Sequence, residues 1–419
     1  MNVHGGKSND KLDDYDPDSL DVATALARIL DVIPELAADD EVELRQAIGR
    51  VLSRAVVSRM DVPAHRNSAM DGYAIRAADA GAEQPLPVVG TAFAGHPFAG
   101  IVGAGEAVRI MTGAVVPAGA DCVVMQEQAR RDNDRVHISE SQTPGMHIRE
   151  PGEDIRAGAR VFEPGRMLLP ADLGLIASLG IGTVFCKQPA RVAFFSTGDE
   201  IRSIGAALGP GEIYDSNRYS IHGMLSRLPV AIHDFGVIPD RPESLRAALL
   251  DAAACADVVL TSGGVSVGEA DHIKDLLAEV GTINFWKVAM KPGRPLAFGR
   301  IGDALFFGLP GNPVSVMVTF YLFVRPALMR LLGCVLPPAP VFSVRTTKLI
   351  RKRPGRTEYQ RGVLQHQDDG TVAVAPTGDQ GSGILSSMSF ADCFIILPAA
   401  CGNVAAGDSV RVQPFHGFL

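Results

Sequence analysis

The stretch Ser262–Asp271, Ser-Gly-Gly-Val-Ser-Val-Gly-Glu-Ala-Asp, combines a glycine-rich loop with two carboxylates. The apolar run before it is typical of a buried strand, and the apolar residues at 273, 276, 277 and 280 define one face of a helix. Backbone amides bared by such a loop, with the positive end of the helix dipole behind them, bind anions. Because the loop lacks both the Lys-Ser/Thr ending of a P-loop and the GxGxxG spacing, we expect a simple phosphate or oxyanion, with a ligand-free tight turn as the alternative. The residues expected to contact the anion are Ser262, Gly263, Gly264, Ser266 and Gly268.

Polar side chains also follow two other apolar runs that are typical of strands. Thr197 and Glu200 follow the run at 191–196, and Asp240 follows the run at 231–237. Carboxylate oxygens are the protein ligands that Mg²⁺ prefers, usually together with substrate phosphates. We therefore predict that Glu200, Asp240 and Asp271 hold Mg²⁺ beside the anion loop.

Three cations, Lys287, Lys291 and Arg294, lie near the end of a further apolar run. Side chains alternate along a strand, so positions 287 and 291 share a face if the strand is regular. Like charges at this spacing repel each other unless an anion lies between them, so we expect a ligand with several negative charges. The alternative is a solvated basic edge. A basic clamp, metal-binding carboxylates and a glycine-rich loop together fit attack on a phosphoanhydride.

A second polar set lies earlier in the chain. Asp71 belongs to the turn-like stretch Asn-Ser-Ala-Met-Asp-Gly-Tyr-Ala at 67–74, and Thr112 follows a strand-like run at 108–111. Arg149 and Asp154 lie in a turn flanked by glycine and proline. The alternative for the first stretch is turn chemistry, in which Asn, Ser and Asp bond to their own backbone.

The order of the expected elements predicts how these side chains are positioned. From Arg191 onward strands and helices alternate, which predicts a parallel sheet with helices on both faces and ligands at the carboxyl ends of its strands. Helical segments on both sides of an earlier β-rich block indicate that the block is an insertion. The predicted fold is a multidomain α/β protein. Its expected units are a disordered tail at 1–16, an elongated first domain at 17–60 and 149–187, an inserted β-domain at 61–148, an α/β domain at 188–335 and a C-terminal β-barrel at 336–419.

Length and composition exclude several classes of protein. With 419 residues the chain is long enough for about three or four domains, and its net charge of −8 disfavours wholesale nucleic-acid binding. The six Cys residues include no CxxC pair, which predicts reduced cytoplasmic thiols rather than a disulfide framework or a zinc site. No apolar run reaches the roughly 18 residues of a membrane span, and the polar N-terminus has no apolar signal core. We expect a cytoplasmic protein that does not enter the membrane.

Five motifs together resemble those of a known family. They are the stretch 67–74, Ser196-Thr-Gly-Asp-Glu200, the stretch 262–271, Lys291-Pro-Gly-Arg-Pro295 and Gly308-Leu-Pro-Gly-Asn-Pro-Val-Ser315. They resemble the MoeA family of molybdopterin molybdenumtransferases, which is also present as the E domain of gephyrin. The resemblance runs from about Leu20 to the C-terminus and implies that the α/β domain binds molybdopterin. It also implies a head-to-tail homodimer, in which the α/β domain of one subunit and the inserted domain of the other share one active site.

The resemblance further implies a reaction and a set of residues. The expected substrates are adenylylated molybdopterin and molybdate, the metal enters the dithiolene, AMP leaves, and a divalent cation is required; transient contacts with other molybdenum cofactor biosynthesis proteins are expected too. On the inserted side it points to Asp71, Thr112, Arg149 and Asp154. On the α/β side it points to Glu200, Asp240, Asp271, Lys287 and Lys291. Around the anion pocket it points to Pro310, Ser315, Arg361 and Ser382.

The chain departs from the family pattern in two places, and two other functions remain as alternatives. His65-Arg66 and Glu150-Pro151 stand where the family often has an aromatic–Asp pair and a more basic pair, which bears on the shape of the partner-facing loop. Adenylylation of molybdopterin is the alternative among enzymes, although a single α/β domain would suffice for it. An interaction scaffold of the gephyrin kind is the alternative of another class, but that function would need a second fused molybdopterin domain or a long linker.

Overall fold

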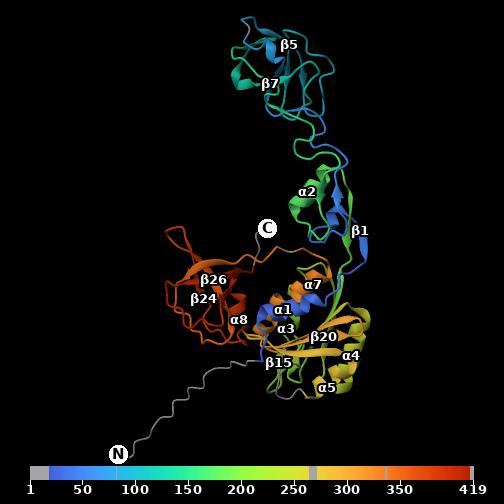
Figure 1. Ribbon diagram of the computed structural model, residues 1–419, viewed down its shortest axis with the longest axis vertical. Coiled ribbons are helices and arrows are strands. Elements are labelled where there is room, and N and C mark those ends of the chain that lie inside the picture. The colour runs from blue at the N-terminus through green and yellow to red at the C-terminus, as the bar shows by residue number, and fades with distance from the viewer. Residues whose placement is uncertain (1–17, 82, 264–270, 336, 416–419) are drawn as a thin grey trace, which may run out of the picture.

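The computed structural model describes residues 18–81, 83–263, 271–335 and 337–415, with the side chains of 271–274 left aside. The described chain is elongated (Figure 1). A β-rich unit carrying β5 and β7 lies at one end, a small unit with α2 and β1 lies in the middle, and an α/β unit lies at the other end. The C-terminal strands form a fourth group beside the α/β unit. The two polar sets noted in the sequence therefore lie toward opposite ends of the molecule.

The α/β unit is built on a mixed sheet with the strand order β16-β13-β17-β21-β20-β18. The first four strands are parallel, and β20 and β18 are antiparallel to their neighbours. The predicted parallel sheet is therefore confirmed for its centre. The antiparallel arm arises because short turns, with no crossover helix, connect β18, β20 and β21. The strands span β13 Ala190–Thr197, β16 Val230–Ile238, β17 Val258–Ser262, β18 Thr282–Lys287, β20 Pro295–Ile301 and β21 Ala304–Leu309.

Helices cover both faces of this sheet, as the alternating pattern predicted. One core contains Phe194, Leu260 and Phe307 together with side chains of α1, α3, α6 and α7, while the other contains Phe195 and Phe306 with side chains of α4 and α5. Neighbouring phenylalanines lie in different cores because successive side chains of a strand point to opposite faces of the sheet. The helices span α1 Val22–Asp31, α3 Asn217–Leu225, α4 Pro242–Cys255, α5 Asp271–Val280, α6 Pro313–Thr319 and α7 Arg325–Leu331.

The helix α1 packs on the α/β unit although it lies in the segment 17–60 that we expected in the first domain. Ala25 and Ile29 are fully buried in the same core as α7, because the apolar stripe of α1 finds its partner there. Its N-cap is Asp21, whose carboxylate accepts a hydrogen bond of 3.0 Å from the Thr24 amide.

The run Pro313–Leu331 joins α6, a π-helical turn η4 Phe320–Val324 and α7. Within the described residues it is one helix of 19 residues that by length and composition could cross a membrane. Thr319 and Arg325 interrupt its apolar residues, so it is not the continuous apolar run whose absence was noted in the sequence. Phe320, Phe323 and Leu328 are buried in the core of the α/β unit, so the run packs as a core helix here.

The middle unit is built from two segments that flank the β-rich unit in the sequence. In the middle unit β1 pairs with β12, β2 pairs with β11, and α2 covers them. The β-rich unit has the strand order β7-β4-β6-β5-β9-β8. The middle elements span β1 Asp39–Glu43, β2 Val56–Val57, β11 Arg160–Phe162, α2 Pro170–Ser178 and β12 Thr183–Lys187. The strands of the β-rich unit span β3 Asn67–Ser68, β4 Gly72–Ile75, β5 Leu86–Ala92, β6 Ala107–Ile110, β7 Cys122–Met125, β8 Ala129–Asp132, β9 Arg135–Ile138 and β10 Ile148–Arg149.

The C-terminal unit is a closed β-barrel, as predicted. Its strands follow the order β23-β24-β22-β26-β25 and close through pairing of β25 with β23. One strand of the α/β unit, β19 Met290–Lys291, adds to the free stretch of β23 in parallel. The barrel is therefore joined to the α/β unit by backbone hydrogen bonds. Its elements span β22 Phe342–Thr346, β23 Thr357–His366, β24 Val372–Pro376, α8 Leu385–Ser389, β25 Cys393–Leu397 and β26 Ser409–Pro414.

Candidate oxyanion site between the sheet and the barrel

A cavity of about 790 Å³ lies between the carboxyl ends of β13, β17 and β21 and the C-terminal barrel. The barrel contributes Arg356, the loop 380–383 and Leu385 as the far wall. A hydrogen bond of 3.1 Å from the Val314 amide to the Ser382 carbonyl holds that loop against the start of α6. The predicted site residues that line the cavity are Thr197, Glu200, Ser262, Gly263, Lys291, Arg294, Pro310, Ser315 and Ser382. Residues Gly264, Ser266 and Gly268 lie outside the described residues, and so does the side chain of Asp271.

Two glycines allow the backbone to approach closely at this cavity. Gly263 has a φ of +94°, and a Cβ there would lie 2.4 Å from the Thr197 carbonyl oxygen. Gly293 has a φ of +93°, and a Cβ there would lie 2.7 Å from Thr319 Oγ1. Only glycine adopts this conformation without strain and without a clash. The glycines of two of the sequence motifs are therefore required by the shape of the cavity wall.

A buried polar network forms the floor of the cavity. Asn217 Nδ2 donates to Ser262 Oγ at 2.8 Å and to the Gly311 carbonyl at 2.6 Å. Asp215 Oδ1 accepts from Ser196 Oγ at 3.1 Å, and it also caps α3 by accepting from the Arg218 amide at 3.1 Å. Asp215 and Asn217 were not among the site residues predicted from the sequence. Their position between a strand end and the sheet edge is the signal that could have found them.

Some polar atoms of this floor are available to a ligand. Thr197 Oγ1 and Asn217 Oδ1 are buried and have no hydrogen-bond partner within the described part of the chain. A buried polar atom of this kind normally bonds to water or to a ligand. The floor of the cavity is therefore suited to a ligand that carries hydrogen-bond donors as well as negative charge.

The structure separates the two lysines that we expected on one strand face. The strand β18 ends at Lys287, and Lys291 belongs to β19, which pairs with the barrel. The expectation of a shared face is therefore wrong, because the strand is not regular between the two positions. Lys291 lines the cavity, and its Nζ lies 3.5 Å from Glu358 Oε1 of the barrel. Lys287 is exposed and is not among the lining residues.

Carboxylates gather at the edge of the cavity. Glu200 lines it, and Asp240 follows β16 at the neighbouring strand end. Partial burial raises the pKa of Asp240, and the nearby charges of Asp199 and Glu200 raise this pKa further. Within the described residues no group of three or more His, Cys, Asp or Glu side chains is arranged to hold a metal ion. Glu200 and Asp240 nevertheless form an oxygen-only, negatively charged edge, which is the chemistry that suits a hard cation.

Arg361 lies behind the cavity wall rather than in it. Its side chain is almost fully buried, with 1% of its surface exposed. Its Nε donates to Ser387 Oγ at 3.0 Å, and its Nη2 donates to the Gly381 carbonyl at 3.2 Å. Burial lowers the pKa of Arg361 to about 10. In this structure Arg361 supports the loop that lines the cavity and is not itself among the lining residues, and its expected contact with an anion stays a prediction.

Gln380 is a second support of this loop, and the sequence did not reveal it. Its Oε1 accepts from the Arg361 amide at 2.7 Å, and its Nε2 donates to the Arg361 carbonyl at 3.2 Å. The side chain thus imitates a neighbouring β-strand. Because Gln380 also lines the cavity, the loop and β23 are held as one rigid wall.

The inserted β-domain carries the second polar set far from this cavity. Asp71 and Thr112 are brought together, since Asp71 Oδ1 accepts from the amide and from Oγ1 of Thr112 at 2.7 and 2.6 Å. Arg149 lies on β10, and Asp154 lines a separate cavity of about 780 Å³. One chain alone does not bring these residues to the cavity beside the sheet, because they lie toward the opposite end of the molecule (Figure 1).

The two departures from the family pattern lie against each other. Arg66 Nε donates to Glu150 Oε1 at 3.1 Å. This ion pair links the segment that enters the inserted unit to the segment that leaves it. Both side chains are exposed, and such pairs contribute at most about 1 kcal/mol. The departures therefore compensate each other's charge without altering the residues Asp71 and Thr112.

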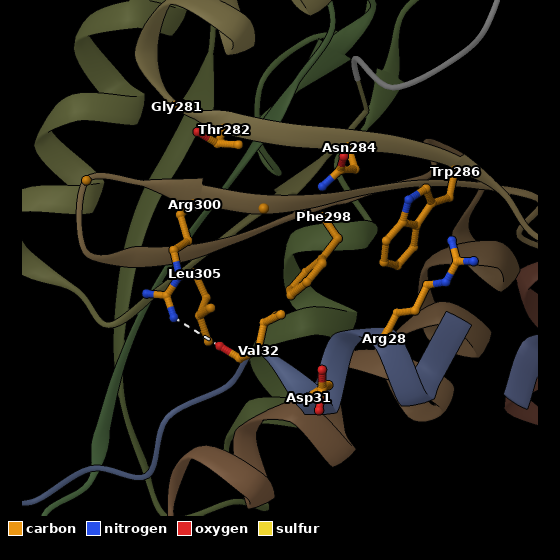
Figure 2. Close-up of a pocket in the computed structure, with 12 residues that line it drawn as sticks. Arg28, Asp31, Val32, Gly281, Thr282, Asn284, Trp286, Phe298, Arg300 and Leu305 are labelled. Atoms are coloured by element: carbon orange, nitrogen blue, oxygen red, sulfur yellow. Dashed lines mark hydrogen bonds between the residues drawn. The ribbon is translucent and has the colours of Figure 1, made fainter. Parts of the chain in front are cut away.

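Another cavity, of about 570 Å³, lies between α1 and the antiparallel arm of the sheet (Figure 2). Trp286 and Phe298 point into it from the sheet, with Val32 and Arg28 on the α1 side. Its lining includes none of the predicted site residues. Nine of the predicted site residues line the cavity between the sheet and the barrel instead.

Fold and site together define a class of protein. An α/β sheet covered on both faces, with a cavity at its carboxyl edge that is lined by glycines, Lys291 and Arg294 and bordered by a β-barrel, is suited to an enzyme that handles an anionic substrate.

Comparisons with known proteins assign the class more narrowly. The models for the MoeA N-terminal region (domain I and II), for a probable molybdopterin binding domain and for the MoeA C-terminal region (domain IV) match residues 20–180, 193–330 and 343–415. A molybdopterin molybdenumtransferase of Haemophilus influenzae is 42% identical over 397 residues, covering 94% of this chain and 98% of that protein. Gephyrin of Dictyostelium discoideum is 34% identical over 423 residues, covering 89% of this chain and 59% of gephyrin.

Solved structures agree with this assignment. A crystal structure of the molybdopterin biosynthesis moeA protein from Pyrococcus horikoshii matches with a TM-score of 0.82 and 29% identity, covering 95% of this chain and 100% of that one. The chain belongs to the MoeA family of molybdopterin molybdenumtransferases, as the sequence motifs indicated. Its role is that of a transferase in molybdenum cofactor biosynthesis.

Proposed function

We propose that this protein inserts molybdate into adenylylated molybdopterin and releases AMP. The observation that carries the proposal is the cavity beside the sheet, which is lined by Lys291, Ser315 and Thr197, the last with a buried hydroxyl that lacks a partner within the described residues. Hydroxyls and an ammonium are donors that bind tetrahedral oxyanions and phosphates. Within a family of molybdopterin molybdenumtransferases, molybdate and the substrate phosphate are the natural occupants.

The residues of the cavity have separable roles in this reaction. Lys291 stabilises the negative charge that develops on the phosphate when the phosphoanhydride is cleaved and AMP leaves. The floor of Asn217 and Thr197 orients the molybdopterin by hydrogen bonds, and the barrel loop at 380–383 excludes water. The rigid wall held by Arg361 and Gln380 keeps these groups in place during the reaction.

The carboxylate edge fits the divalent cation that we expect the reaction to require. Glu200 and Asp240 would hold Mg²⁺, together with Asp271. When bound, Mg²⁺ would neutralise phosphate charge at the cleaved anhydride. The raised pKa of Asp240 supports this assignment, because carboxylates that repel one another gain stability from a cation between them.

We further propose that the active site is shared between two subunits of a cytoplasmic homodimer. Asp71 and Thr112 form a preorganised pair on the inserted unit, yet that unit lies far from the cavity of its own chain. A second copy could place its inserted unit over the carboxylate edge. Asp71 would then complete the site in trans.

The reaction itself is the direct test of this proposal. Purified protein is mixed with adenylylated molybdopterin and Mg²⁺, and AMP release is followed by chromatography with and without molybdate. We expect AMP release that depends on molybdate and that yields molybdenum-bound molybdopterin in equal amount. Release of AMP without transfer of molybdenum would contradict the proposal.

A further inference from the structure

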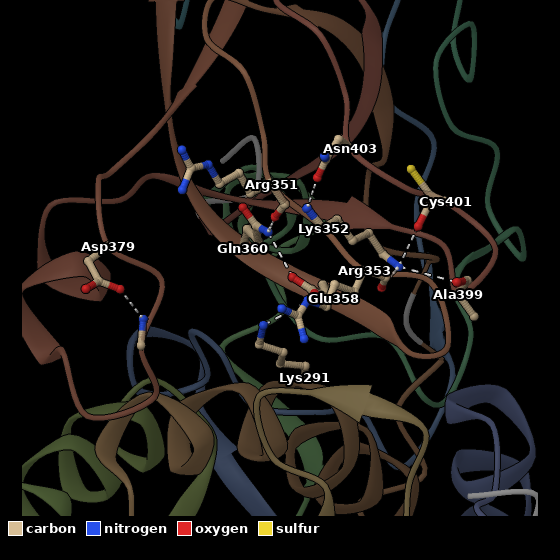
Figure 3. Close-up of polar contacts among 11 residues, drawn as sticks. Lys291, Arg351, Lys352, Arg353, Glu358, Gln360, Asp379, Ala399, Cys401 and Asn403 are labelled. Carbon is tan, nitrogen blue, oxygen red and sulfur yellow. Dashed lines mark hydrogen bonds and ion pairs between the residues drawn. The ribbon is translucent and has the colours of Figure 1, made fainter. Parts of the chain in front are cut away.

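A cation of the cavity is shared between two parts of the chain. Lys291 Nζ lies 3.5 Å from Glu358 Oε1, and this ion pair joins β19 of the α/β unit to β23 of the barrel (Figure 3). The two side chains differ in exposure, since 50% of the lysine side chain and 6% of the glutamate side chain are accessible to solvent. The glutamate thus lies behind the wall, while the lysine faces both the glutamate and the cavity.

The glutamate is fixed in place from its other side. Its Oε2 accepts a hydrogen bond of 2.8 Å from Gln360 Nε2, and this Nε2 also donates to the Arg351 carbonyl at 3.0 Å. Figure 3 shows Gln360 between Glu358 and Arg351, with Lys291 on the opposite side of Glu358. A buried carboxylate that is held in this way cannot follow a lysine that moves. Lys291 is therefore the mobile member of the pair.

An oxyanion in the cavity competes with Glu358 for the same ammonium. The buried carboxylate of Glu358 loses its counter-charge when the half-exposed lysine moves away, so Glu358 opposes displacement of Lys291 toward the cavity. Arg356 adds a second positive charge to the cavity lining on the barrel side. The negative charge of Glu358 also weakens the attraction of this cationic group for a dianion.

We propose that Glu358 is a positioning residue that holds Lys291 back and thereby limits the affinity of the cavity for molybdate. The inference rests on the proposed function, since it takes molybdate as the ligand of this cavity. It assigns to the barrel a part in setting substrate affinity, through one carboxylate that does not itself line the cavity. The weakened affinity favours release of unused oxyanion, and the ion pair holds Lys291 in one position before the substrate binds.

The sign of the change in affinity separates this role from a purely structural one. We expect Glu358→Gln to bind molybdate more tightly than the wild type, by about twofold to fivefold, the effect of removing a partly exposed ion pair. A glutamate that only supports the wall would give weaker binding when replaced. Titration calorimetry with sodium molybdate measures the dissociation constant without turnover. Asp251→Asn, an exposed carboxylate on α4, makes the same change in net charge and should leave the constant unchanged.

A double-mutant cycle tests whether Glu358 acts through Lys291. In a Lys291→Met background, Glu358→Gln should no longer increase the affinity, because the competed ammonium is absent. If Glu358→Gln does not fold, Glu358→Asp serves instead. Its shorter side chain places the carboxylate farther from Lys291, so this variant protein should also bind molybdate more tightly than the wild type. Unchanged or weaker binding by the folded variant, beside a wild type that binds, overturns the inference alone. A wild-type protein that does not bind molybdate overturns the proposed function instead.

Discussion

Asp71 and Thr112 form one preorganised unit on the inserted β-domain. The carboxylate of Asp71 accepts two hydrogen bonds from Thr112, at 2.7 Å from the amide and 2.6 Å from Oγ1. These bonds, the hydroxyl bond first, lower the pKa of Asp71, so the group is ionised at neutral pH. The two bonds to Oδ1 fix the orientation of the carboxylate group. A fixed orientation suits a carboxylate that acts on a ligand rather than one that maintains a fold.

The first prediction concerns the charge of Asp71. Asp71→Asn keeps an oxygen that can accept both bonds from Thr112, so the melting temperature should be nearly unchanged. AMP release should fall by at least about 10-fold, the low end of acid–base or metal effects. Thermal unfolding and the AMP assay are measured on the same preparation. Full activity in this variant would remove Asp71 from the proposed site.

The second prediction tests whether two chains share the site. An inactive Asp71→Asn protein is mixed with an inactive Asp271→Asn protein under conditions that exchange subunits. Heterodimers would carry one intact site, so part of the activity should return, whereas each variant alone stays inactive. Subunit exchange is verified with differently tagged chains. Proven exchange without any recovery would argue for a site within one chain.

The third prediction uses the raised pKa of Asp240. The carboxyl group of Asp240 binds its proton more tightly in the folded protein than in the unfolded chain, so ionisation of Asp240 destabilises the fold. The penalty is fully present above the raised folded pKa and disappears as pH falls below the ordinary value of 3.8. Asp240→Asn should therefore raise the melting temperature at pH 7 by about 1–3 °C and leave it unchanged near the acid end.

A cation provides the companion measurement for Asp240. Mg²⁺ should raise the melting temperature of the wild type at pH 7 and should raise that of Asp240→Asn less, because one carboxylate of the edge is lost. Asp303→Asn, an exposed carboxylate in a turn away from the edge, serves as the control and should respond like the wild type. Equal Mg²⁺ shifts for all three proteins would show that Asp240 takes no part in binding the cation.

The fourth prediction concerns the support of the barrel loop. Arg361→Met removes the hydrogen bonds that Arg361 donates to Ser387 Oγ and to the Gly381 carbonyl, which should lower the free energy of unfolding by about 1–3 kcal/mol. Arg361→Lys should not restore it, since an ammonium cannot reproduce the fork of the guanidinium. Chemical denaturation measures the stability. Arg345→Met, an exposed arginine on the same barrel, should change it by less than about 0.5 kcal/mol, and an equal loss in both variants would contradict the assignment.

The sequence predicted well those features that depend on local pattern. Apolar runs such as Val258–Leu260 are buried strands, and the polar residues that follow them, Thr197 and Ser262, do line one cavity. Parallel strands end at the same edge of a sheet, so their carboxyl-terminal residues meet whatever the details of the loops. The family motifs were likewise readable, because each is a contiguous stretch.

Features that depend on distant packing could not be predicted in the same way. The helix α1 was assigned to its neighbours in sequence, but its apolar stripe packs on α7 far along the chain. Lys287 and Lys291 were expected on one strand because no local sequence feature indicates that β18 ends at Lys287 and that β19 pairs with the barrel. The same pairing brings Lys291 into contact with Glu358, which lies 67 residues away in the sequence.

The central claim is that the oxyanion used in the reaction binds between the sheet and the barrel, at Lys291. AMP release measured against molybdate concentration tests it most directly, with Lys291→Met compared to the wild type and to Lys287→Met. Loss of one charge-assisted bond in a desolvated site costs roughly 1.5–3 kcal/mol, or about one to two decades. We predict that Lys291→Met shifts the molybdate requirement upward by this amount, while Lys287→Met, outside the cavity, shifts it less. If the curve of Lys291→Met overlays that of the wild type at every concentration, the oxyanion binds elsewhere and the account is wrong.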